Sequence, residues 1–150
     1  FFSGMRPAVN VGLSVSRVGG AAQTKAMKKA AGSIRIDLAQ YREMEVFTQF
    51  SSDLDDDTKE QLQYGKGLME LLKQPLCQPL SMAEQVITLW TATHKIFLNV
   101  DVKKIKETQK GMLEYIKNAH PEIIDELNET KALSDELGDK ILAAAKEYVK

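Results

Sequence analysis

The spacing of apolar residues after Lys25 is the feature that most constrains the fold. From there nearly to the end of the chain, apolar side chains such as Ile34, Leu38 and Tyr41 recur three and four places apart, with charged residues between them. This period matches the helical turn and places one apolar stripe on each helix. The sequence therefore predicts a mainly α fold, with a helical bundle over residues 24–150.

Start and stop signals divide this region into separate helices. Gly32 marks a break before a first long helix that runs to about Phe50, and Pro75 ends the second helix by Gln74, because the residue before a proline avoids the helical conformation. The later helices are expected to begin at capping residues or at a first-turn proline: Ser81 with Glu84, Asp101, Pro121 and Ser134.

The residue types that bind metals do not form a convincing metal site. The acidic run Ser51–Thr58 lacks the glycine that a calcium-binding loop needs for its bend, so it is read as a turn and a helix cap. Cys77 is the single cysteine, which excludes an internal disulfide. His94 has no histidine or cysteine three or four residues away and is expected to be structural, beside Trp90.

A glycine-rich segment before the bundle carries a different pattern. Apolar residues alternate with small or polar ones over 11–16, as in a strand with one buried face, and Gly19 and Gly20 are expected to end that strand. Arg17 then lies near the carboxyl end of a strand, where open α/β sheets bind ligands, and its planar guanidinium matches phosphate oxygens. The pattern alone leaves a solvated surface arginine as an open alternative.

Length and composition are consistent with one core. The chain has 150 residues, 43% of them hydrophobic and 27% charged. Its net charge of −1 favours no nucleic-acid or anionic-membrane surface, and no apolar run approaches the roughly 20 residues that span a bilayer. One strand cannot form a sheet, so residues 1 to about 20 are expected to be part of a larger domain, and poorly ordered or rearranged here.

The run from Ser3 to Lys25, which includes Ser-Val-Ser-Arg-Val-Gly-Gly at 14–20, resembles the alpha-subunit family of the rotary, proton-driven ATP synthase. Three later segments resemble that family in order and approximate spacing: Ala39–Glu43, Gln49–Asp55 and Glu70–Gln74. The resemblance implies that residues 1–23 are the last strand and glycine turn of a RecA-like α/β nucleotide-binding domain. Residues 24–150 would be the C-terminal α-helical bundle domain.

The same resemblance implies a catalytic role for the glycine-rich segment. In the family, the arginine matching Arg17 is an arginine finger that reaches the nucleotide phosphates held by the neighbouring beta subunit. Such a cation stabilises the charge of a phosphoryl-transfer transition state. Ser14 matches a position needed for activity, and its simplest role is to hold the strand that aims Arg17. Val15 and Ser16 would line the same nucleotide-binding interface.

A second, regulatory nucleotide site is also implied. Residues matching Arg6 and Pro7 flank the adenine, and the glutamine matching Gln74 contacts it from a proline-braced loop. Leu76 stands where many members of the family carry a second glutamine. The expected cofactor is ATP or ADP with Mg in the intact complex. This chain alone is expected to be inactive and to hold none, because it has no Gly-x-x-x-x-Gly-Lys-Ser/Thr phosphate loop.

The implied partners are the beta and gamma subunits, in an alternating hexameric ring at the cytoplasmic face of a bacterial cell membrane. The attachment would be peripheral, with no direct insertion into the membrane. No nucleic-acid partner is expected. Three alternatives stay open: a paralogous ring-ATPase subunit, a non-enzymatic helical scaffold or interaction domain, and a stand-alone small-molecule enzyme. The last is the weakest, because no nucleophile, base and orienting group converge in the sequence.

Overall fold

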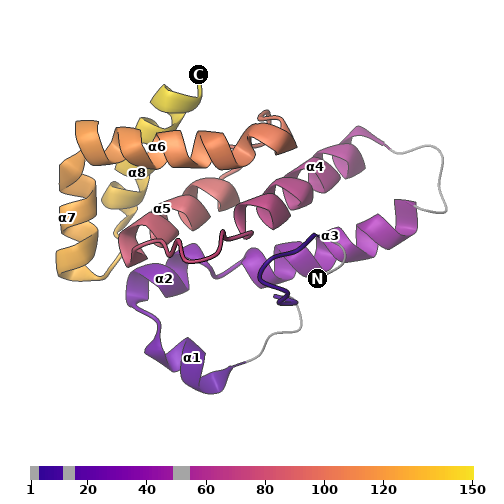
Figure 1. The fold of residues 1–150 in the computed structure, drawn as a ribbon, viewed down its shortest axis with the longest axis horizontal. Helices are drawn as coiled ribbons and strands as arrows, with labels where there is room; N and C mark the ends of the chain where they lie inside the picture. The colour runs from indigo at the N-terminus through magenta and orange to yellow at the C-terminus, as the bar shows by residue number, and fades with distance from the viewer. Residues whose placement is uncertain (1–3, 12–15, 49–54) are drawn as a thin grey trace.

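The computed structural model describes residues 4–11, 16–48 and 55–150, and all the regular elements in these ranges are helical. Figure 1 shows the α-helices of the described residues and the path of the chain between them: α1 (Arg17–Ala22), α2 (Lys25–Ala30), α3 (Ile34–Thr48), α4 (Asp56–Leu71), α5 (Met82–Thr93), α6 (Ile105–Ala119), α7 (Pro121–Thr130) and α8 (Asp135–Val149). A single 3₁₀ turn, Val102–Lys104, leads into α6. The predicted mainly α bundle is confirmed.

Helix α5 forms the centre of the bundle, where α2, α4, α6, α7 and α8 pack around it. Its buried residues therefore come from most of its circumference: Ala83, Val86, Ile87, Thr88, Thr91 and Ala92. Leu89 and Trp90 on this helix are only partly buried and pack against the core. Phe97 is also buried, although it follows the end of the helix.

The predicted helix boundaries are largely confirmed. The helical conformation is interrupted between Ala30 and Ile34, around Gly32. Helix α4 ends at Leu71, before the loop that contains Pro75. Side chains cap the helices that the sequence placed: Asp55 accepts from Thr58 N, Ser81 and Glu84 form a capping box, and Ser134 accepts from Leu137 N. Local signals thus set most of the helix ends.

Helices α3 and α4 pack closely at Gly65. A Cβ atom at Gly65 would lie 2.2 Å from Cδ2 of Tyr41, whose side chain is buried on α3. The glycine therefore permits a backbone approach that no larger residue allows. This close packing offsets the weak helix propensity of an interior glycine.

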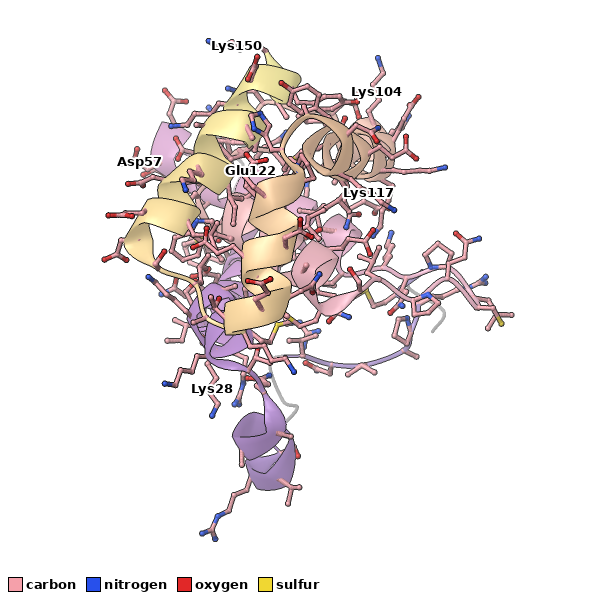
Figure 2. The ribbon with its side chains drawn as sticks, turned by 90° about the vertical axis from the view of Figure 1, so that its left-hand side faces the viewer. Lys28, Asp57, Lys104, Lys117, Glu122 and Lys150 are labelled. Atoms are coloured by element: carbon pink, nitrogen blue, oxygen red, sulfur yellow. The ribbon has the colours of Figure 1, made fainter. Side chains whose placement is uncertain are left out.

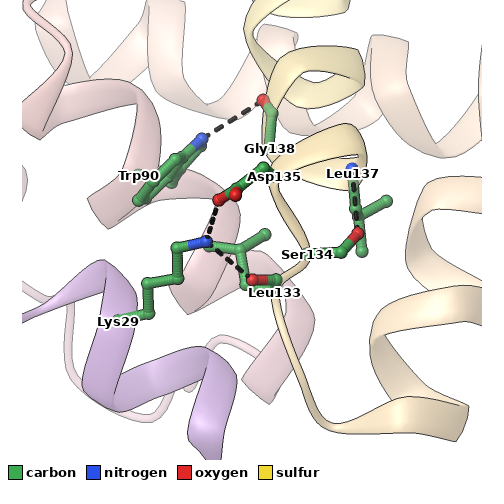
Figure 3. A network of polar contacts seen from close by, with 7 residues as sticks. All are labelled: Lys29, Trp90, Leu133, Ser134, Asp135, Leu137 and Gly138. Carbon is green, nitrogen blue, oxygen red and sulfur yellow. Dashed lines mark hydrogen bonds and ion pairs between the residues drawn. The ribbon is translucent and has the colours of Figure 1, made fainter.

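A polar cluster ties α2 to the start of α8 (Figure 3). Nζ of Lys29 donates to the carbonyl of Leu133 at 3.0 Å and lies 2.6 Å from a carboxylate oxygen of Asp135. The same ammonium lies 5.5 Å from the centre of the Trp90 ring, and the indole N–H of Trp90 donates to the carbonyl of Gly138. These contacts give the only tryptophan a structural role.

The two glycines expected to end the predicted strand do not form a turn. Gly19 and Gly20 lie inside α1 rather than in a turn, and Arg17 is the first residue of that helix. Residues 12–15, the centre of the predicted strand, lie outside the described residues, as do residues 1–3. None of the residues of α1 is buried, and Figures 1 and 2 show this helix projecting from the bundle.

None of the described helices is long and apolar enough to cross a membrane. In Figure 2, charged side chains such as Lys28, Lys117 and Glu122 lie on the outside of the bundle. The core inside it is almost entirely aliphatic.

Alkaline pH is expected to destabilise the α3–α4 contact. Burial, with a hydrogen bond donated to Glu45, raises the pKa of Tyr41 to about 12. The unfolded chain loses this proton near its ordinary pKa of about 10, so stability present below that pH falls as pH rises toward about 12. Urea unfolding at about pH 9.5 and about pH 11.5 should show this loss, on the order of 1 kcal/mol once solvent screening is allowed for, and a smaller loss in Tyr41→Phe. An equal loss in both proteins would contradict the assignment.

Candidate functional site

The structure brings together the residues expected to hold a regulatory nucleotide. The backbone N–H of Gln74 donates to the backbone carbonyl of Arg6 at 2.9 Å, although the two residues are far apart in the sequence. Pro7 follows Arg6 through a cis peptide bond. All three residues are solvent-exposed, so their side chains are accessible to a ligand.

The N-terminal strap, residues 4–11, is held against the bundle on both sides of Arg6 and Pro7. Met5 is buried, and Val11 packs against the core. Asn10 accepts a hydrogen bond from the guanidinium of Arg42 on α3. The strap is therefore anchored by apolar contacts and by a polar one, which fix the backbone that presents Arg6 and Pro7.

The proline loop, residues 72–80, is braced at both ends. Lys73 pairs with Glu70 at 2.6 Å, and the side chain of Gln85 donates to the carbonyl of Leu80 at 2.8 Å. Between them, the side-chain amide of Gln74 donates to the carbonyl of Gln78 at 3.4 Å. Leu76 is 91% exposed, so the loop tip contributes an uncovered apolar side chain beside Gln74.

The chemistry of these three residues suits a planar, polar-edged ring. A glutamine amide offers both donors and an acceptor, which can pair with the edge of a base. A guanidinium can stack on an aromatic face, and a proline ring offers a rigid apolar surface. The site could therefore hold the base of a nucleotide, while no described residue here forms a phosphate-binding loop.

Arg17 lies in a separate part of the molecule. Its exposed side chain is at the start of α1, and it makes no hydrogen bond or ion pair with another described residue. Ser16 caps this helix by accepting from Gly19 N at 2.9 Å. Ser14 and Val15 lie outside the described residues. Helix α1, which begins at Arg17, thus lies apart from the N-terminal strap (Figure 1).

Two contacts near these residues were not expected from the sequence. The pairing of Arg42 with Asn10 joins distant segments and has no local signal. Lys106 on α6 donates to the carbonyl of Leu71 at the end of α4, and it too comes from a distant part of the chain. Only the Glu70–Lys73 pair could have been found in the sequence, from its three-residue spacing on a helix.

The sequence is similar to those of known proteins. Residues 23–148 match the family described as ATP synthase alpha/beta chain, C terminal domain, so the chain belongs to this family. Within it, the chain is similar to alpha subunits: it is 49% identical to ATP synthase subunit alpha of Clostridium kluyveri and 49% identical to that of Lawsonia intracellularis. Each match covers all of this chain and 30% of the relative's length. The resemblance inferred from the sequence is confirmed.

Proposed function

We propose that this chain serves as the C-terminal part of an ATP synthase alpha subunit, a regulatory and non-catalytic subunit. It supplies an arginine finger to the catalytic site of a neighbouring beta subunit, for proton-coupled ATP synthesis and hydrolysis. The family match over 23–148 and the 49% identity to alpha subunits support this proposal. Residues 1–23 are then the tail of the nucleotide-binding domain, and residues 24–150 are the helical bundle domain.

The observation that carries the regulatory role is the hydrogen bond from Gln74 N to Arg6 O, 2.9 Å long. It joins the strap and the proline loop, so the three side chains proposed to contact adenine lie on adjoining backbone. Gln74 hydrogen-bonds the base edge, and Arg6 and Pro7 flank the ring. The cofactor is ATP or ADP, with Mg, in the assembled complex.

The catalytic contribution rests on Arg17. A guanidinium that is exposed and makes no hydrogen bond or ion pair with another described residue is available to a neighbouring subunit. A cation supplied in trans stabilises the charge that spreads over the phosphoryl oxygens in the transition state. Ser14, Val15 and Ser16 flank it in sequence and are proposed to shape the interface that aims it.

The proposed partners are the beta and gamma subunits, in an alternating hexameric ring that is attached peripherally to the cytoplasmic face of the cell membrane. A non-enzymatic helical scaffold would explain the bundle equally well. It gives no reason for an exposed arginine within the glycine-rich segment, or for the joined strap and loop. A paralogous ring-ATPase subunit is less favoured, because the curated relatives named here are alpha subunits.

Gln74→Ala in the full-length alpha subunit is expected to weaken binding of a fluorescent ADP analogue at the regulatory site. Loss of a neutral hydrogen bond costs about 0.5–1.5 kcal/mol, which corresponds to roughly two- to tenfold in the dissociation constant. A fluorescence titration of the assembled complex measures this change. Gln61→Ala, at an exposed position on α4, is the matched control and should bind as the unmodified complex does. Equal affinity in all three proteins would overturn the proposed contact.

A further inference from the structure

The ammonium group of Lys106 lies at the point where α4 gives way to the proline loop. Its Nζ donates to the backbone carbonyl of Leu71 at 2.7 Å and to Oε1 of Gln109 at 3.1 Å. Leu71 is the last residue of α4, and Gln74 follows it by three places in the chain. A side chain of α6 is therefore hydrogen-bonded to the backbone at the start of the proline loop.

The other end of this contact is anchored in the core. Gln109 is only 4% exposed and donates through Nε2 to Oγ1 of Thr88 on α5 at 3.2 Å, and Thr88 is itself only 3% exposed. No buried side-chain nitrogen or oxygen in the described part of the chain lacks a partner. Because burying an unpaired amide is costly, these hydrogen bonds hold Gln109, and through it Lys106, in one arrangement.

Several physical effects act on Lys106 at this place. The last carbonyls of a helix have no partner within the helix and carry partial negative charge, so an ammonium donor satisfies and stabilises them. Burial lowers the pKa of Lys106; the nearby carboxylate of Glu70 opposes this shift, and the charge of Lys73 adds to it. The structure therefore keeps a partly desolvated lysine where its main contacts are a carbonyl and an amide oxygen.

We propose that Lys106 is a positioning residue for the regulatory nucleotide site, acting through the Leu71 carbonyl to set the direction in which the proline loop leaves α4. That direction allows Gln74 N–H to reach the carbonyl of Arg6 and so places the Gln74 side chain beside Arg6 and Pro7. The link runs from Thr88 and Gln109 in the core, through Lys106, to the nucleotide loop. This inference rests on the proposed function for its ligand, but its structural part can be measured without one.

The test uses the full-length subunit in the assembled complex, with Lys106→Met, which keeps length and apolar surface but removes the donor. Amide hydrogen exchange at Gln74 should become more than about tenfold faster, since the loop that presents its N–H to the Arg6 carbonyl is no longer held in place. Binding of the fluorescent ADP analogue should weaken by about three- to tenfold. Lys106→Arg, which retains a donor and a charge, should restore most of both properties. Lys110→Met is the matched control, because Lys110 lies one turn later on α6 with its side chain 81% exposed.

The possible outcomes separate this inference from the function on which it rests. Faster exchange at Gln74 in Lys106→Met, with the original rate restored in Lys106→Arg, supports the positioning role. This holds even if Gln74→Ala leaves ADP affinity unchanged; only the proposed nucleotide contact would then fail. Unchanged exchange at Gln74 in Lys106→Met overturns the inference. If the Lys106→Met complex does not assemble, Lys106→Gln takes its place, because the shorter glutamine side chain keeps a donor for Gln109. Faster exchange at Gln74 then supports the positioning role, and unchanged exchange overturns it.

Discussion

Replacing Arg17 by lysine in the intact complex is expected to lower the rate of ATP hydrolysis by about 10³-fold or more, while the complex still assembles. Lysine keeps the positive charge but loses the planar fork that meets two phosphate oxygens at once. The variant should fold normally, since Arg17 is exposed and α1 buries none of its residues. Steady-state hydrolysis and gel filtration of the reconstituted complex measure the two properties separately.

Arg35→Lys is the matched control for this experiment. Arg35 is exposed on α3, within the helical bundle and outside the glycine-rich segment, so its substitution should leave hydrolysis unchanged. If Arg17→Lys also retains full turnover, the catalytic proposal fails. The glycine-rich segment would then be structural, and the chain would be better explained as a helical interaction domain.

Gly65→Ala is expected to destabilise the chain by about 1–3 kcal/mol, although alanine is the better helix former. The added Cβ would lie within 2.6 Å of three atoms of Tyr41, including its Cβ and Cγ. These atoms are close to the backbone of α3 and cannot swing away, so the two helices must separate. The midpoint of urea or thermal unfolding reports the loss.

Gly111→Ala provides the contrast, because it presents a contact that is nominally closer. A Cβ there would lie 1.9 Å from the hydroxyl oxygen of Tyr148, but that atom is the far end of a side chain that is 40% exposed. Tyr148 can rotate into solvent, so Gly111→Ala should lie within about 0.5 kcal/mol of the original protein or be more stable. Equal destabilisation by the two substitutions would contradict the packing account of Gly65.

The helix ends could be predicted from the sequence because their signals are local. Ser81 and Glu84 form both hydrogen bonds of the capping box, and Ser134 caps α8, as the residue types indicated. Pro75 likewise kept α4 from continuing into the loop. Each of these depends on residues within one turn, so the sequence contains the whole interaction.

Other features could not be predicted, because distant segments decide them. Helix α5 is buried on most sides because five helices pack around it. An apolar stripe read from the sequence predicts burial on one face only. The contact of Gln74 with Arg6 needs both the strap and the loop in place. Gly19 and Gly20 suggested a turn from their weak helix propensity, whereas Ser16 caps a short helix that includes them.

The candidate site was predictable only through the resemblance to alpha subunits. Nothing in the residue types of Arg6, Pro7 and Gln74 alone indicates that they meet, and the pattern around Arg17 alone was compatible with a solvated arginine. The structure adds the adjoining backbone of Gln74 and Arg6 and the core link through Lys106. The first of these contacts brings the backbones of Arg6 and Gln74 together, as the proposed nucleotide site requires.

The most direct test of the account is a cryo-electron-microscopy map of the assembled complex with bound ADP and Mg. An adenine ring is expected between Arg6 and Pro7, with the Gln74 amide within hydrogen-bonding distance of the base. The guanidinium of Arg17 is also expected beside the nucleotide phosphates of the neighbouring beta subunit. A map in which nucleotide occupies neither position, with the complex fully assembled, would contradict it.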